Sequence, residues 1–215
     1  MRTAIILDCE FLCRQGSLGR LWCGVQDPDP VIAQIGAVQL GLEGSFPILD
    51  SYKAYVRPMD RFGTRFDVDP YFTALTGITE ADLESKGIAL DEALAGLDRF
   101  SGGARFWSWG KDELYMVAIS CYVAGIRPAI PAHRFDNAVK LLVAAGTPIG
   151  ELEKMRSNQL ADHFGVAHPA WQAHDALDDA LSVAYALQHL LRAGKLEPNA
   201  FNAPQSAIPA TDGDR

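Results

Sequence analysis

Two carboxylates stand at the end of the first apolar run of the chain. Residues 3–7 are apolar and partly β-branched, which predicts a central strand covered on both faces, and Asp8 and Glu10 follow directly. Because side chains alternate along a strand, both carboxylates project from the same face. Two such groups raise each other's pKa unless a cation lies between them. The pair therefore indicates either a solvated strand end or a metal site.

Two further acidic segments begin apolar helices. Asp112 and Glu113 start one helix, and His174-Asp-Ala-Leu-Asp-Asp179 opens the last one. The helix dipole favours acids at such positions whatever the function. The last helix is rich in alanine and leucine, so it can pack closely on a sheet and turn one face of its acidic turn inward. Helical geometry alone leaves open which acid points inward, and it puts His174 in the loop or cap before the first turn.

The elements that must position these groups follow an α/β pattern. The short turn at 43–45 makes the second and third strands antiparallel, and residues 134–143 fit either a fifth strand or the start of a helix. A meander followed by alternating strands and helices predicts a mixed sheet with helices on both faces. The expected strands are 3–7, 31–42, 48–57 and 104–109, and the main helices are 90–100, 112–124, 158–164 and 175–191.

Length and charge restrict the class of protein. The 215 residues, 48% of them hydrophobic, suit one globular domain, which we expect to span residues 1–197 with a mobile tail at 198–215. The formal net charge of −8 excludes a basic nucleic-acid-binding surface at the level of bulk composition. Any contact with phosphate must then use a local basic patch or bound cations. The four cysteines have neither disulfide-scaffold nor zinc spacing.

The sequence also predicts neither a secretory signal nor a membrane span. Residues 1–10 do not read as a secretory signal, because a carboxylate pair follows a single basic residue. The longest apolar stretch, residues 114–126, is too short to span a bilayer. We therefore expect a cytoplasmic protein with no membrane contact; the pattern specifies no oligomeric state.

Taken together, the acidic segments resemble a known family. Asp8-Cys-Glu10, Trp109-Gly-Lys-Asp112 and His174-x4-Asp179 are similar, in order and spacing, to the three motifs of the DEDDh 3′–5′ exonucleases of the ribonuclease H-like superfamily. The middle motif looks closest to the Trp-Gly-x-x-Asp form of the branch that includes the histone-mRNA 3′-end exonucleases. Three linking segments also resemble the family, namely Gln34-Ile-Gly-Ala-Val38, Leu75-Thr-Gly-Ile78 and Asn158-Gln-Leu-Ala-Asp-His-Phe-Gly165.

The resemblance, which covers about residues 3–193, implies a fold and a role for each matching residue. It implies an α/β, ribonuclease H-like fold with a mixed five-stranded sheet and helices on both faces. Asp8, Glu10, Asp112 and Asp179 would be the metal-binding catalytic acids, and His174 would be the general base. The His-x4-Asp spacing selects Asp179 among the acids of its turn, a choice that the residues alone leave open.

The resemblance also implies substrate contacts and shows two departures. Phe11, Leu75 and Thr76 would bind substrate, with Leu75 similar to a residue that wedges between terminal bases. Phe11-Leu12 stands where the family often has Thr-Gly, and the link from Phe11 to Val31 is longer than usual. The first departure concerns the backbone contact to the terminal nucleotide, and the sequence assigns no role to the longer link.

The implied chemistry is phosphodiester hydrolysis. Four carboxylates suit two Mg²⁺ or Mn²⁺ ions ~3.5–4 Å apart, and a histidine suits removal of a proton from the attacking water. The expected function is a metal-dependent 3′–5′ exonuclease that releases nucleoside monophosphates from the 3′ end of single-stranded RNA or DNA, with RNA slightly favoured. The alternatives are an oligonucleotide or dinucleotide phosphodiesterase and a catalytically inactive nucleic-acid-binding module on the same fold.

Overall fold

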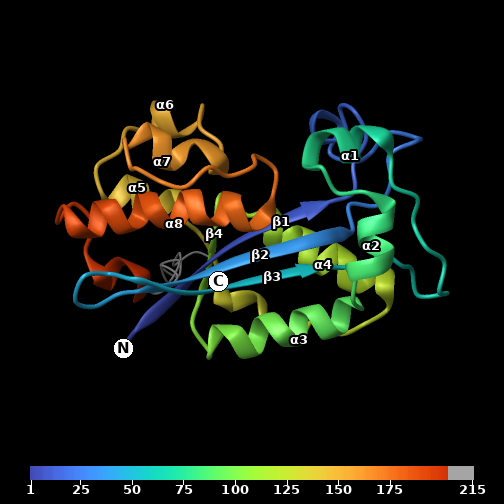
Figure 1. Ribbon diagram of the computed structural model, residues 1–215, viewed down its shortest axis with the longest axis horizontal. Helices are drawn as coiled ribbons and strands as arrows, with labels where there is room; N and C mark the ends of the chain where they lie inside the picture. The colour runs from blue at the N-terminus through green and yellow to red at the C-terminus, as the bar shows by residue number, and fades with distance from the viewer. Residues whose placement is uncertain (203–215) are drawn as a thin grey trace, which may run out of the picture.

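A five-stranded mixed sheet forms the centre of the molecule (Figure 1). The computed structural model describes residues 1–202. The strands lie in the order β3-β2-β1-β4-β5, and β1 pairs antiparallel with β2 and parallel with β4. This arrangement confirms the expected mixed sheet. The strands are β1 (Thr3–Phe11), β2 (Ile32–Gly41), β3 (Ile48–Tyr55), β4 (Phe106–Ser108) and β5 (Phe135–Asn137).

Several details of the strands differ from the sequence expectation. β1 continues to Phe11, so Asp8 and Glu10 lie within the strand and not after it, and the register shifts only between Glu10 and Phe11. β4 is shorter than expected. The ambiguous segment 134–143 contains both the strand β5 and most of the helix α5, so each of the two alternatives describes one part of it.

Helices cover both faces of the sheet (Figure 1). α8 packs on one face, whereas α3 and α4 pack on the other. The α-helices are α1 (Pro70–Thr76), α2 (Glu80–Lys86), α3 (Leu90–Ser101), α4 (Asp112–Ala124), α5 (Val139–Ala144), α6 (Ile149–Leu152), α7 (Leu160–His163) and α8 (Ala176–Arg192). The 3-10 helices are η1 (Leu18–Arg20), η2 (Ala132–Arg134), η3 (Ser157–Gln159) and η4 (Pro198–Asn202).

The alternation of β1 decides where its carboxylates point. Ile5 and Leu7 pack into the cluster with α3 and α4, whereas Ile6 packs into the cluster with α8. Asp8 and Glu10 continue the even-numbered series of Ile6, so they face the α8 side of the sheet. The apolar run therefore both anchors the strand on its two faces and aims the acids at the start of α8.

The carboxyl-terminal boundary of the domain differs from the expected one. Residues 198–202, which we expected to belong to a mobile tail, form η4, and Phe201 is buried at 3% exposure. Its ring contacts Trp107 edge-on, with centroids 5.4 Å apart. A single aromatic side chain thus ties five more residues to the core than the loss of apolar periodicity indicated. Residues 203–215 of the expected tail lie outside the described residues.

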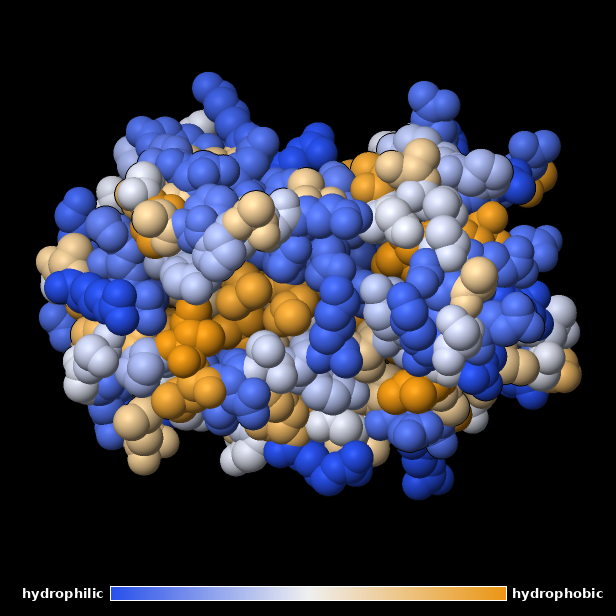
Figure 2. Space-filling model, in the orientation of Figure 1, coloured by the Kyte–Doolittle hydropathy of each residue, from blue (hydrophilic) through white to orange (hydrophobic). Residues whose placement is uncertain are grey.

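The surface of the face shown in Figure 2 is largely polar. Apolar side chains gather there mainly in a hollow between α8 and the β2–β3 hairpin. Among residues 1–202, no helix combines the length and the apolar character needed to cross a bilayer.

Candidate active site

The carboxyl end of β1 and the first turn of α8 bring three acids together. Asp8 and Glu10 are each 8% exposed, and Asp179, in the first turn of α8, is 4% exposed. Buried carboxylates are uncommon unless a partner compensates their charge. His174 lies in the loop before the helix, as expected from the sequence, and has a left-handed φ of 62°.

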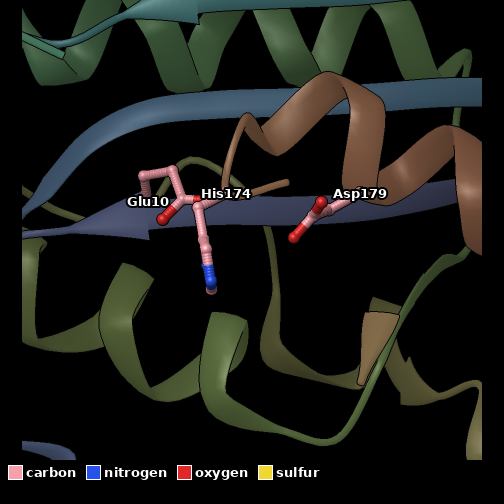
Figure 3. A group of neighbouring side chains, drawn as sticks. All are labelled: Glu10, His174 and Asp179. Atoms are coloured by element: carbon pink, nitrogen blue, oxygen red, sulfur yellow. The ribbon is translucent and has the colours of Figure 1, made fainter. Parts of the chain in front are cut away.

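Glu10, His174 and Asp179 form the tightest part of this cluster (Figure 3). One ligand atom from each, two carboxylate oxygens and one imidazole nitrogen, lie within 4.8 Å of one another. The side chains come from β1, from the loop before α8 and from α8 itself, and they approach the same space. Segments more than 160 residues apart in the chain therefore meet in one site.

Polar contacts hold the start of α8 against β2. The Oε1 atom of Gln34 accepts a hydrogen bond of 2.7 Å from the backbone N–H of Ala176. Asp175 is the N-cap residue, accepts from the backbone N–H of Leu177 at 3.1 Å, and forms an ion pair with Lys53 of β3. These contacts satisfy N–H groups that a helix leaves free at its start. They also fix the positions of His174, which precedes Asp175 in the chain, and of Asp179, which follows it.

A cleft of about 430 Å³ opens over the cluster. The expected metal-binding and base residues all contribute to its lining. The non-acidic walls come from the long loop after β1, from α1, from the segment before α4 and from η3. The lining includes Asp8, Glu10, Asp112, Glu113, His174 and Asp179, together with Phe11, Arg14, Leu18, Trp22, Tyr71, Leu75, Trp109, Met155, Arg156, Ser157 and Asn158.

The two neighbouring acids at the start of α4, Asp112 and Glu113, differ in burial. Asp112 lines the cleft but is exposed, and no hydrogen bond from its side chain is found among the described residues. The next residue, Glu113, is 5% exposed, and its Oε2 atom has no hydrogen-bond partner among residues 1–202. The sequence interpretation set Glu113 aside as a second acid at a helix start. The structure instead buries Glu113 beside Asp8 and leaves Asp112 at the rim.

The sequence held a signal for this shift. Counted from Trp109, the acid of a Trp-Gly-x-x-acid motif falls on Glu113, whereas Asp112 is one position too early. Matching the residue type aspartate selected Asp112, and matching the spacing selects Glu113. Spacing is the better guide here, because adjacent residues at the start of a helix point in directions about 100° apart.

The acids raise one another's pKa. Burial raises the pKa of Asp8 well above its ordinary value, and the nearby charges of Glu113 and Glu10 raise it further. Burial, followed by the charge of Asp179, raises the pKa of Glu10 to about 8. Burial is also the main cause that raises the pKa of both Glu113 and Asp179 to about 7. Without a compensating cation, the four groups cannot all be ionised at neutral pH.

The donor set fits a hard divalent cation. The buried Oε2 of Glu113 and Oδ1 of Asp179 have no hydrogen-bond partner within residues 1–202. The other oxygen of Asp179 accepts a long hydrogen bond of 3.3 Å from the Ser157 hydroxyl. Carboxylate oxygens with free lone pairs are the ligands that Mg²⁺ and Mn²⁺ prefer. The residues present therefore suit such an ion in both chemistry and charge.

His174 differs from the acids because its pKa is lowered. Partial burial disfavours its charged form, and the positive charge of Arg156 acts in the same direction. At neutral pH the imidazole is accordingly uncharged and able to accept a proton. This state is the one that a general base requires.

The three expected substrate-binding residues divide into two groups. Phe11 and Leu75 line the cleft. Thr76 does not, because its side chain is buried at 2% exposure and serves α1 itself. Its hydroxyl donates to the carbonyl of Phe72 at 2.9 Å and accepts from the N–H of Ile78 at 3.1 Å. The Thr76 side chain therefore gives no support to the predicted substrate contact at this residue.

The mixed sheet with helices on both faces is a ribonuclease H-like fold. The family model described as "Exonuclease" (RNase_T) matches residues 5–187. This chain belongs to the exonuclease family. Among curated protein sequences, none matches the chain.

Solved structures agree with this fold. A full-length 3′-exonuclease superposes with a TM-score of 0.71 at 17% identity, over 90% of this chain and 62% of its own. A 3′-exonuclease that recognises the histone mRNA stem-loop gives 0.71 at 18% identity, over 90% and 65%. E. coli Exonuclease I in complex with a dA16 oligonucleotide gives 0.59 at 18% identity, over 94% and 42%. The chain thus spans less than two thirds of each of these proteins.

Proposed function

We propose that this chain is a metal-dependent 3′–5′ exonuclease that releases nucleoside monophosphates from the 3′ end of single-stranded nucleic acid. One observation carries the proposal: four buried or nearly buried carboxylates, those of Asp8, Glu10, Glu113 and Asp179, meet His174 in a single cleft. Such a set is costly to bury, since two of its oxygens lack partners within residues 1–202. Family membership supports nuclease activity in general.

The carboxylates of Asp8, Glu10, Glu113 and Asp179 would hold the divalent ions, for which Mg²⁺ or Mn²⁺ are the candidates, two in number. When bound, such a pair neutralises phosphate charge and activates water for an in-line displacement. The formal charge of the four ionised acids, −4, balances two dications. An acidic chain can in this way accept an anionic polymer without a large basic surface.

His174 would remove the proton from the attacking water at its free imidazole nitrogen. Its lowered pKa keeps that nitrogen unprotonated at neutral pH, and its position within 4.8 Å of ligand atoms of Glu10 and Asp179 supports this role. The left-handed backbone at His174 costs on the order of 1 kcal/mol or more, and such strain is often retained at functional sites. General-base help of this kind contributes roughly 10²–10⁴ in rate.

The cleft walls suit the end of one strand. Phe11, Tyr71 and Leu75 offer flat or apolar surfaces for terminal bases, and Arg156 on the η3 side lies exposed beside the acids. No ion pair of Arg156 is found among the described residues, which leaves its guanidinium available to a phosphate. We propose RNA as the favoured substrate on the basis of the histone-mRNA-type middle motif, with DNA as the second choice.

A second candidate is a phosphodiesterase specific for dinucleotides or short oligonucleotides. The net charge of −8 favours it, because long strands are commonly held by many lysine and arginine contacts. The chemistry would be the same, and only the dependence on substrate length would differ. An inactive binding module is disfavoured by the complete set of acids with His174.

The test uses 5′-labelled single-stranded 20-mers of RNA and DNA, with Mg²⁺, with Mn²⁺ or with excess chelator. The proposal expects a ladder that shortens by one nucleotide from the 3′ end, abolished by chelator and by Glu10→Gln. A labelled dinucleotide run in parallel decides between the two candidates through the ratio of kcat/KM values. Degradation that persists in chelator, or fragments from internal cleavage, would contradict the mechanism.

A further inference from the structure

The loop of residues 12–31, which joins β1 to β2, forms a large part of the cleft wall. It contributes Cys13, Arg14, Gly16, Ser17, Leu18 and Trp22 to the lining. Figure 1 shows this loop together with α1 on one side of the end of β1, whereas α6 and α7 lie on the other side. The additional residues of this link therefore form part of the cleft wall and do not lie on a remote part of the surface.

Internal hydrogen bonds hold the loop in one shape. The side chain of Asp27 is 1% exposed and accepts from the Ser17 hydroxyl at 2.8 Å, from the backbone N–H of Gly24 at 2.7 Å and from Arg20 at 2.6 Å. A buried carboxylate with three donors fixes the segments that carry them. Residues 17–27 accordingly form one unit around Asp27.

Two further contacts attach the loop to the rest of the site. The indole N–H of Trp22 donates to the carbonyl of Leu12 at 2.9 Å, and its ring meets Phe11 edge-on with centroids 5.5 Å apart. Arg14 pairs with Asp69, the N-cap residue of α1, at 2.9 Å. Loop 12–31, the end of β1 and α1 thus make one continuous wall.

Leu18 is an exposed apolar side chain of this wall. It is 65% exposed and lines the cleft, so it contributes little to the core. Leu21, three residues later, is 75% exposed but does not line the cleft. Figure 2 shows further apolar atoms among polar ones at this end of the molecule. An exposed apolar side chain in the wall of a cleft is suited to the face of a base.

Resting on the proposed function, we infer that loop 12–31 forms a subsite for a nucleotide upstream of the one released. Leu18 would contact the base of that nucleotide, and Arg14, half exposed beside Asp69, would contact its phosphate. Base faces are free for such contacts in an unpaired strand, so the subsite selects single-stranded ends longer than one nucleotide. The loop is then a specificity element for substrate length.

The experiment compares Leu18→Ala and Arg14→Gln with Leu21→Ala, which makes the same leucine truncation on the same loop but away from the cleft. Activity is measured on the p-nitrophenyl ester of thymidine 5′-monophosphate, which reaches only the cleavage position, and on single-stranded oligonucleotides of increasing length. We expect kcat/KM on a decanucleotide to fall about tenfold more than on the ester for Leu18→Ala and Arg14→Gln. Leu21→Ala should behave as wild type on both.

Equilibrium binding gives a second readout that needs no turnover. The Kd of a fluorescein-labelled decanucleotide, measured with Ca²⁺ in place of Mg²⁺, should rise about tenfold for the two cleft variants and not for Leu21→Ala. Equal losses on ester and oligonucleotide, or equal Kd values for Leu18→Ala and Leu21→Ala, would overturn the subsite. The two proposals can also fail separately. If the Kd values differ among the variants as expected but the wild-type protein cleaves neither substrate, the exonuclease proposal is refuted and the subsite is supported.

Discussion

Gly36 of β2 lies directly beneath Ala176, the first residue of α8. A Cβ atom at position 36 would stand 2.1 Å from the carbonyl carbon of Ala176 and 2.2 Å from the backbone nitrogen of Leu177. The helix start therefore touches the sheet backbone at a residue that has no side chain. This close approach sets the height of α8 above the sheet and, with it, the distance from Asp179 to Glu10.

Gly36→Ala should therefore disturb both stability and site geometry. Because the clash is with backbone and not with a flexible side chain, we expect a loss of about 3 kcal/mol in the free energy of unfolding, together with most of the nuclease activity. Denaturant unfolding and an oligonucleotide assay measure the two effects. Gly150→Ala in α6 is the control, since no atom lies within 4 Å of its added Cβ. Equal stability of the two variants would show that α8 can shift freely.

Glu113 and Asp112 make a matched pair for testing the third metal-binding acid. We expect Glu113→Gln to weaken Mn²⁺ binding by about 10–100-fold or more, because even an outer-shell partner is worth that much. Asp112→Asn, which changes an exposed side chain in the same turn, should change Mn²⁺ affinity far less. Calorimetric titration of the folded proteins with Mn²⁺ measures the affinity of each variant directly. The reverse order of the two affinities would return the role to Asp112.

His174→Ala separates a base from a ligand. The imidazole lies within 4.8 Å of both Glu10 and Asp179, so proximity alone permits either role. As a base, its removal should lower kcat by roughly 10²–10⁴ and leave Mn²⁺ affinity intact. Glu10→Gln is the comparison, which should lose both. If His174→Ala loses Mn²⁺ affinity to the same extent as Glu10→Gln, His174 is a ligand and another group must take the proton.

The acid cluster should make the metal-free protein less stable as pH rises. The pKa is raised to about 8 for Glu10 and to about 7 for Asp179 and Glu113, whereas unfolded carboxyls titrate near ~4. A raised folded-state pKa gives stability that is complete below about pH 4 and is lost as pH rises through about 7–8. In chelator, the melting temperature should therefore fall between pH 5 and pH 8.

Added divalent metal and a neutral variant test the direction in which the melting temperature changes with pH. Saturating Mg²⁺ should reduce the fall in melting temperature, because it stabilises the ionised carboxylates that the folded state otherwise disfavours. Glu10→Gln should flatten the dependence in chelator by removing one of the titrating groups. A melting temperature in chelator that is constant or that rises from pH 5 to pH 8 would argue against a repulsive acid cluster.

Much of the fold and of the site was readable from the sequence. The period of two in β1 put Asp8 and Glu10 on one face, and the Ala-rich last helix predicted close packing at the segment that carries Asp179. The short turn at 43–45 fixed the antiparallel pairing of β2 and β3. Each of these inferences depends on a local rule, namely strand alternation, side-chain size or turn length, which the neighbouring elements do not change.

Tertiary structure decided the remaining features, because they depend on how one element is rotated or placed against another. Asp112 and Glu113 satisfy the same helix-start rule, and although the spacing from Trp109 favours Glu113, it is the orientation of α4 on the sheet that buries this side chain. Thr76 is withdrawn from the cleft by its own helix turn, and Phe201 extends the domain by reaching Trp107. The sequence gives the chemical type of each of these residues. The direction in which a side chain points depends on how its helix or strand packs against the rest of the molecule.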